Sequence, residues 1–283
     1  MKITVAVENS VAFPFNPGIR PGILGEHGLS FVVELDGEKW LYDTGRGIAL
    51  LPNLRTLQIE PDEIRGVILS HAHLDHFGAL MDFLKVRSTP VDVYMHQAAF
   101  ARRYTRIGDS YRFVGLPWSE EELTSAGAIL HQNEEPLCLA PGLWLTGGVE
   151  RKNNFESVEK KFFIDGENGE KCHDTIVDDQ ALLIETRKGV IVLTGCAHAG
   201  ICNILETAKV ILPHKHVRAV LGGLHLEGAT TARLQATADY LQAQHLDMLA
   251  VGHCTGFGAC CLLNGRMPGI FTPINAGMVI TLD

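Results

Sequence analysis

The chain has 283 residues, of which 24 are Lys or Arg and 33 are Asp or Glu, so its formal net charge is −9. Hydrophobic residues make up 46% and charged residues 20% of it, which is typical of a globular protein with a large core and excludes a disordered or fibrous one. The acidic balance favours an enzyme with a small-molecule substrate over a protein that binds nucleic acid. No run approaches the ~18 consecutive apolar residues of a membrane-spanning helix, so we expect no membrane partner.

The cysteines indicate a reducing compartment. Their number is odd, and they lack the paired spacing of a disulfide framework. They are Cys138, Cys172, Cys196, Cys202, Cys254, Cys260 and Cys261. Since the N-terminal segment also lacks the apolar stretch and cleavage site of a signal peptide, we expect a cytoplasmic protein. The sequence does not determine its oligomeric state.

Strands and helices alternate along the chain. Apolar patterning predicts strands over 3–7, 29–35, 39–42, 66–69, 91–95, 181–185, 190–193, 217–221, 248–251 and 278–282. Helices are predicted over 78–85, 97–104, 119–125, 201–212 and 230–244. Ser119 and Glu122 have the spacing of a capping box. Residues 14–28, which are rich in proline and glycine, predict a long loop.

One pattern recurs four times: an apolar strand, a small or polar residue, and then a histidine before a turn or helix. The four copies are GVILSHAHLDHFGAL, VIVLTGCAHAGICNIL, RAVLGGLHLEGA and DMLAVGHCTGFGACC. Ligands of α/β proteins collect at the carboxyl ends of strands. A single histidine of this kind is commonly satisfied within its turn, but four together favour one shared site.

The densest cluster is His71, His73, Asp75 and His76, four potential ligands within six residues. Neutral imidazoles and a carboxylate suit zinc or a similar first-row cation. The alternative is a solvated polar loop. We favour the metal, because burying these groups without a cation would leave many polar atoms to satisfy.

This HxHxDH cluster resembles the signature of the metallo-β-lactamase superfamily. Asp43 in LYDTG resembles the early strand-end aspartate of that superfamily, and His253 in VGHCTG resembles its late ligand histidine. The resemblance implies an α/β fold, an αββα sandwich of two similar halves that forms one metallo-β-lactamase-like domain over residues 1–283. It also implies a site for one or two metal ions at the sheet edge.

The wider pattern resembles one branch of the superfamily. Its motifs here are EHGLSFVVE, DDQALLIE, TGCAHAGI, GGLHL and GHCTG. Members of that branch include dihydropterin-linked ribofuranosylaminobenzene 5'-phosphate synthase-like proteins and proteins known only as metal-dependent hydrolases. Because one fold hosts many reactions, the motifs indicate the branch more strongly than they indicate its reaction.

The middle of the chain departs from the superfamily pattern. Many members carry a bridging aspartate where this chain has Cys196, in the sequence TGCAHAG. Cys196 is therefore either a thiolate ligand or a small core residue, and His198 is the more plausible ligand. Asp43 is expected either at the metal or behind it, as the outer acceptor that a metal-bound imidazole needs.

Other residues have weaker patterns around them. His225 in GGLHL is expected to be a proton donor, a substrate contact or an extra ligand, the alternative being a histidine satisfied within its turn. Glu26 and His27 either touch substrate or anchor a loop. The arginines at 102, 103 and 106 either meet a phosphate or lie on a solvated helix face. Segments 102–124 and 145–174 are predicted to be loop-rich and able to cover the site.

Two reactions follow from the resemblance. In the first, a hydrolase acts on a small ester, lactone, amide or phosphoester through metal-activated water. His71, His73 and His198 then hold one ion, and Asp75, His76 and His253 hold the other. Zinc is expected as one or two ions, with manganese, iron or magnesium as alternatives, and Asp75 and His225 are the candidate catalytic residues.

In the second reaction, a transferase joins a dihydropterin diphosphate to an arylamine and releases diphosphate, and the cation stabilises the departing charge. A metal held only for sensing or structure is the non-enzymatic alternative. Structural zinc sites are usually closed cages of four ligands, whereas this chain offers six or seven candidates.

Overall fold

The computed structural model describes residues 1–11, 22–166 and 168–282, so the loop predicted over 14–28 lies partly outside the described residues. The chain divides into two compact units. Unit 1 comprises residues 1–133, 159–178 and 275–282, and unit 2 comprises residues 134–158 and 179–274. The single domain expected over 1–283 stays a prediction.

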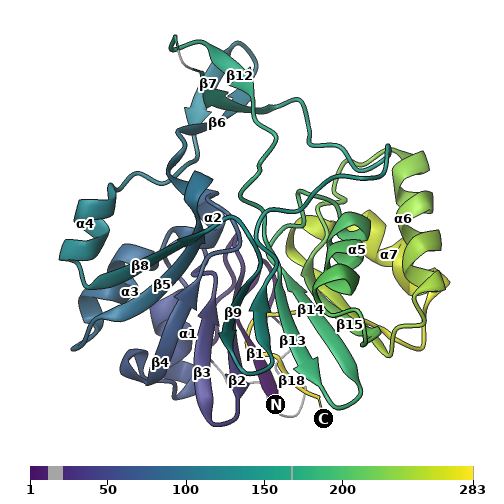
Figure 1. Ribbon diagram of the computed structural model, residues 1–283, viewed down its shortest axis with the longest axis horizontal. Coiled ribbons are helices and arrows are strands. Elements are labelled where there is room, and N and C mark those ends of the chain that lie inside the picture. Colours follow the sequence, from purple (N-terminus) through teal and green to yellow (C-terminus); the bar gives the residue numbers. More distant parts are fainter. Residues whose placement is uncertain (12–21, 167, 283) are drawn as a thin grey trace. The chain divides into compact units, whose positions relative to one another are not determined.

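Unit 1 is built on a seven-stranded sheet with the order β18-β1-β2-β3-β4-β5-β8 (Figure 1). Its strands are β1 (Lys2–Val7), β2 (Ser30–Leu35), β3 (Glu38–Tyr42), β4 (Ile64–Ile68), β5 (Val91–His96), β8 (Ala128–Asn133) and β18 (Val279–Thr281). Neighbours from β18 to β3 are antiparallel, and neighbours from β3 to β8 are parallel. The segments after β3 and β4 therefore leave the sheet at the same edge.

Short helices complete unit 1. They are α1 (Leu50–Leu57), η1 (Pro61–Glu63), α2 (Leu74–Phe77), α3 (Leu80–Val86), η2 (Gln97–Phe100) and α4 (Glu120–Ser125). The hydrophobic core of this unit joins sheet residues such as Val67 to helix residues such as Phe77 and Phe83. The predicted capping box is confirmed, since the Glu122 N–H donates to Ser119 Oγ and the Ser119 N–H donates to Glu122 Oε2.

A smaller four-stranded sheet also belongs to unit 1, with the order β12-β11-β6-β7. Its strands are β6 (Arg103–Ile107), β7 (Ser110–Phe113), β11 (Phe162–Asp165) and β12 (Lys171–His173). The helix predicted over 97–104 is wrong beyond Phe100, because the chain turns there into β6. Arg103 begins that strand only 1% exposed, so it lies on neither a helix nor a solvated face. Segments 102–124 and 145–174 likewise contain strands where loops were predicted.

Unit 2 repeats the strand pattern of unit 1 in its own sheet, with the order β17-β16-β15-β14-β13-β10-β9. Its strands are β9 (Leu137–Ala140), β10 (Leu143–Leu145), β13 (Leu182–Thr186), β14 (Gly189–Thr194), β15 (Val217–Gly223), β16 (Met248–Gly252) and β17 (Phe271–Pro273). Neighbours from β9 to β14 are antiparallel, and neighbours from β14 to β17 are parallel. Here too, the segments after the parallel strands leave the sheet at one edge.

The helices of unit 2 are α5 (Ile201–Ile211), α6 (Thr231–Ala243), η3 (His253–Thr255) and α7 (Phe257–Arg266). They enclose a second core with the sheet, in which Val192 and Val220 lie with Ile204 and Leu241. The expected α/β class and the expected two halves of similar organisation are confirmed. In the described part of the chain, none of the helices combines the length and apolar character needed to cross a membrane.

Candidate metal centre

The HxHxDH cluster follows β4 and runs into α2, in unit 1. Its three imidazoles are buried, with 2% of His71, 6% of His73 and none of His76 exposed. The ring centroids of His71 and His73 are 4.7 Å apart, and those of His71 and His76 are 4.3 Å apart. Since β4 is an inner parallel strand, the turn after it brings the three imidazole rings together at the sheet edge.

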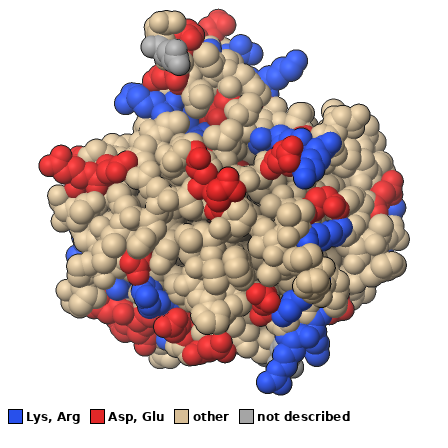
Figure 2. Space-filling model, viewed as in Figure 1, with Lys and Arg blue, Asp and Glu red and all other residues tan. Residues whose placement is uncertain are grey.

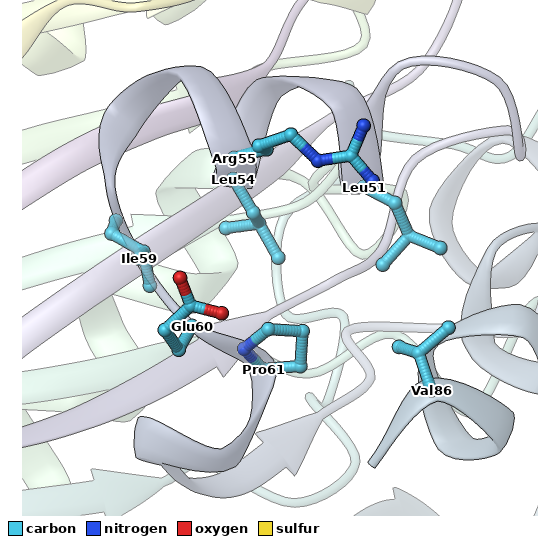
Figure 3. A pocket seen from close by; sticks show the side chains of 7 residues that line it. All are labelled: Leu51, Leu54, Arg55, Ile59, Glu60, Pro61 and Val86. Carbon is cyan, nitrogen blue, oxygen red and sulfur yellow. The ribbon is translucent and has the colours of Figure 1, made fainter.

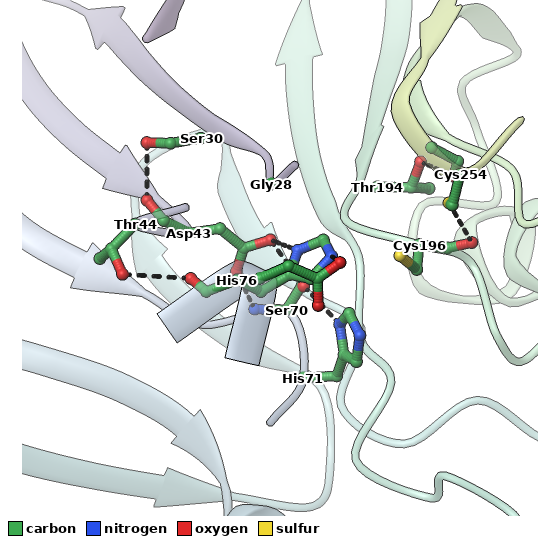
Figure 4. A network of polar contacts seen from close by, with 12 residues as sticks. Gly28, Ser30, Asp43, Thr44, Ser70, His71, His76, Thr194, Cys196 and Cys254 are labelled. Atoms are coloured by element: carbon green, nitrogen blue, oxygen red, sulfur yellow. Dashed lines mark hydrogen bonds and ion pairs between the residues drawn. The ribbon is translucent and has the colours of Figure 1, made fainter. Parts of the chain in front are cut away.

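Asp43 lies directly after β3 and is fully buried. Its Oδ1 accepts the backbone N–H of Ser70 at 2.7 Å, and its Oδ2 lies 2.7 Å from both Ser70 Oγ and His76 Nδ1 (Figure 4). The residue has φ 58°, in the left-handed region that Asp tolerates better than most side chains. Asp43 thus orients His76 through Nδ1, so that Nε2 is the nitrogen that would bind a cation.

His71 has the electrostatic surroundings of a neutral ligand. Burial, and then repulsion from His76 and His73, holds the pKa of its imidazole well below the ordinary value of 6.5. The Oγ of Ser70 lies 2.8 Å from His71 Nδ1, and Ser70 also contacts Asp43. The neutral imidazole that this pKa favours is the form that coordinates metals.

A buried ion pair supports the turn that carries His71 and His73. The backbone N–H of Ala72, between the two histidines, donates to Asp178 Oδ2 at 2.8 Å. Asp178 Oδ1 lies 2.8 Å from the Arg103 guanidinium, which also contacts Asp174. Burial raises the pKa of the Asp178 carboxyl above its ordinary value. The position of the turn that carries His71 and His73 therefore depends on charged residues outside the motif.

Glu26 and His27 have different surroundings. The carboxylate of Glu26 accepts the backbone N–H groups of residues 46 to 49, which places it at the start of α1 as a loop anchor. The Nε2 of His27 lies 3.3 Å from Asp75 Oδ2, and more than half of the His27 side chain is exposed. His27 is therefore the more accessible of the two candidate substrate contacts.

Unit 2 carries the other predicted residues at the carboxyl ends of its parallel strands. Cys196 and His198 follow β14, His225 follows β15, and His253 follows β16. The ring centroids of His198 and His225 are 4.1 Å apart. Both His225 and His253 have positive φ angles, of 47° and 52°. Strained backbone of this kind clusters at functional sites.

An aspartate also supports the histidine turn of unit 2. The backbone N–H of Ala199, next to His198, donates to Asp179 Oδ2 at 2.7 Å. The carbonyl of His198 accepts from the Arg151 guanidinium at 3.3 Å. Asp179 is 2% exposed. Two successive aspartates, Asp178 and Asp179, therefore each accept an N–H beside a candidate ligand, one in each unit.

Sequence reasoning missed these supporting residues. Two adjacent acids shortly before an apolar strand need polar partners when they are buried. That requirement was the available signal for Asp178 and Asp179. For Ser70 and Arg103 no comparable signal exists, because nothing local indicates which distant carboxylate they meet.

A hollow of about 270 Å³ lies elsewhere in unit 1 (Figure 3). It is lined by α1, η1 and the end of α3, with the residues Leu51, Leu54, Arg55, Ile59, Glu60, Pro61 and Val86. None of these residues belongs to the histidine cluster.

On the molecular face shown in Figure 2, acidic and basic side chains are interspersed.

Comparison of the amino-acid sequence with known proteins identifies a family and a relative. A family model described as the metallo-beta-lactamase superfamily matches residues 24–253. The 7,8-dihydropterin-6-methyl-4-(beta-D-ribofuranosyl)-aminobenzene-5'-phosphate synthase of Methanocaldococcus jannaschii is 30% identical over 272 residues, which cover 93% of this chain and 92% of that protein.

Solved structures show the same fold. A crystal structure of a metal-dependent hydrolase of the beta-lactamase superfamily superimposes with a TM-score of 0.83 and 25% identity, over 100% of this chain and 99% of the other. Zinc-bound PqqB from Methylobacterium extorquens gives a TM-score of 0.56 at 14% identity over the whole of both chains. This second likeness concerns the fold alone.

Proposed function

Since the chain belongs to the metallo-β-lactamase superfamily, we propose that it is a metal-dependent hydrolase that acts on a small ester, lactone or phosphoester through metal-activated water. The observation that carries the proposal is the packing of three buried imidazoles after β4, with His76 oriented by the buried carboxylate of Asp43. Scattered free cysteines support a reducing, cytoplasmic setting.

The donor set fits zinc. Imidazole nitrogens and a carboxylate are common zinc ligands, and the surroundings of His71 favour its neutral form. We propose His71, His73 and His198 as ligands of one ion, and Asp75, His76 and His253 as ligands of a second. When bound, zinc supplies a nucleophilic water near neutral pH and polarises the bond under attack.

The residues of this chain have separable roles in that reaction. Asp43 keeps His76 in one tautomer and orientation, because it accepts a hydrogen bond at Nδ1. Asp75 orients the water and takes its proton, and its carboxylate is partly exposed beside His27. We propose that His27, whose imidazole is exposed, contacts the polar end of a substrate.

The test is hydrolysis of p-nitrophenyl acetate, γ-butyrolactone and bis(p-nitrophenyl) phosphate by zinc-loaded protein. We expect turnover of at least one probe, with kcat lowered about 10²–10⁴-fold in Asp75→Ala because proton transfer is lost. His214→Ala is the matched control, since His214 is exposed and outside the cluster. An Asp75→Ala variant that is folded and as active as the wild type would contradict the role of Asp75.

A second function is favoured by one specific observation, the 30% identity to a relative that is named a synthase. In this alternative, an arylamine displaces diphosphate from a dihydropterin diphosphate, and the cation stabilises the departing charge. The readout is diphosphate release with and without an arylamine acceptor. Release that does not depend on the acceptor would exclude this alternative and favour hydrolysis.

A further inference from the structure

Three sulfur or nitrogen donors occupy equivalent positions in unit 2. Cys196, His225 and Cys254 each lie two residues beyond the last residue of a parallel strand, which is β14, β15 and β16 respectively. One donor atom from each side chain lies within 4.8 Å of the other two. The sheet itself therefore brings them together, because adjacent parallel strands end side by side.

The backbone around these residues permits unusually close approach. A Cβ atom on Gly223 would lie 2.6 Å from Cys254 Sγ, so only glycine lets that sulfur sit against the end of β15. Gly222 has φ 115°, and a Cβ there would lie 2.0 Å from the Thr194 carbonyl oxygen. His225 follows with φ 47°, which is costly for a residue with a side chain. These features fix the three donors in one place.

The hydrogen bonds at Cys254 suit a thiolate. The backbone N–H of His225 points to Cys254 Sγ at 3.3 Å, and such a donor stabilises negative charge on sulfur. Cys254 Sγ also lies 3.7 Å from the Cys196 carbonyl oxygen, a contact that an S–H group makes (Figure 4). These two contacts hold Cys254 Sγ beside the ends of β14 and β15.

We propose that Cys196, His225 and Cys254 bind a thiophilic divalent cation of the zinc class, at a site that shares none of the six ligands proposed for hydrolysis. Two thiolates neutralise the charge of such a cation, and three protein donors leave a fourth position open. Occupation of this site does not depend on which reaction the enzyme catalyses.

Cobalt substitution tests the site directly. The wild-type protein is stripped with a chelator and reloaded with Co²⁺, and the near-ultraviolet sulfur-to-cobalt charge-transfer band is recorded. We expect the band in the wild type, and a band of about half the intensity or less in Cys254→Ser and in Cys196→Ser, because each variant removes one of the two thiolates. Cys261→Ser is the matched control, because Cys261 is an exposed thiol in α7, and it should keep the full band.

A His71→Ala variant separates this proposal from the proposed function. We expect it to keep the sulfur band while it loses hydrolysis. A band that disappears with His71 would show that sulfur belongs to the HxHxDH site and would overturn the separate site. Absence of the band from the wild type, or a band of undiminished intensity in Cys254→Ser, would also overturn it.

Zinc X-ray absorption on the wild-type protein detects sulfur ligands without any cysteine variant, so it also serves if those variants fail to fold. The expected spectrum contains a Zn–S shell near ~2.3 Å beside Zn–N shells near ~2.0–2.1 Å. A spectrum of zinc-loaded protein with nitrogen and oxygen shells alone would exclude thiolate binding.

Discussion

At the scale of single residues, the candidate centre depends on carboxylates that the motif does not contain. Asp43 orients His76 through Nδ1, and Asp178 and Asp179 hold the backbone beside the other histidines. Such outer partners set the direction of an imidazole and its basicity. The motif supplies the donor atoms, whereas these carboxylates supply their orientation.

Asp178→Ala is expected to weaken metal binding about 10–100-fold, the usual cost of removing an outer partner. The physical reason is that the Ala72 N–H loses its acceptor, so the turn between His71 and His73 is no longer fixed. Competition with a metal-binding dye measures the affinity. Asp174→Ala is the matched control, since Asp174 contacts the same Arg103, whereas the Ala72 N–H donates to Asp178. Equal weakening in both variants would attribute the effect to the ion pair instead.

At the scale of elements, the candidate site residues lie in turns that follow parallel strands. Unit 1 has Asp43 after β3 and the histidine cluster after β4, and unit 2 has cysteine and histidine pairs after β14 and β16. Positive φ angles at Asp43, Ala197, His225 and His253 occur at these turns. The strands are rigid and buried, so strain in the turns is supported by the sheet.

Helix α4 offers a test of local determination. Ser119→Ala removes the acceptor for the Glu122 N–H and is expected to cost about 1 kcal/mol of helix stability. Hydrogen exchange of the first-turn amides of α4 measures the loss. Ser119→Asp should preserve protection, because a carboxylate also accepts at this position. Unchanged exchange in Ser119→Ala would mean that packing of Leu123, which is fully buried, holds the helix alone.

At the scale of the whole molecule, ion pairs distributed over both units predict acid sensitivity. The hydrogen bond from Lys2 lowers the pKa of Glu34, and the hydrogen bonds from Lys209 and Tyr240 lower that of Glu206. Folded carboxyls with lowered pKa bind protons less readily than unfolded ones. Their stabilisation is therefore present above the ordinary value of 4.5 and is lost as the pH falls through the folded pKa.

Thermal unfolding between about pH 6 and pH 3 checks this expectation. The midpoint should fall with pH below about 4.5, and the fall should be shallower at high salt because exposed pairs are screened. Glu34→Gln should reduce the slope slightly, since one proton-linked group is removed. A midpoint that is constant over this range would show that these pairs do not contribute.

The sequence by itself determined the α/β class, most of the long strands and the ligand-rich turns, because hydrophobic period and motif spacing are properties of neighbouring residues. It also determined the capping box at Ser119. Helices α1 and α7 and the four strands of the smaller sheet were missed, since their local pattern is weak and their packing decides them.

Only the tertiary structure decided what surrounds those turns. The Ala72 N–H donates to Asp178, which is 106 residues away in the sequence. Arg103 is buried rather than solvated. The donor atoms of Cys196, His225 and Cys254 lie close together at the ends of three strands. The physical reason is that a donor's partner is chosen by chain topology, and contacts between distant segments leave no periodic trace in the sequence.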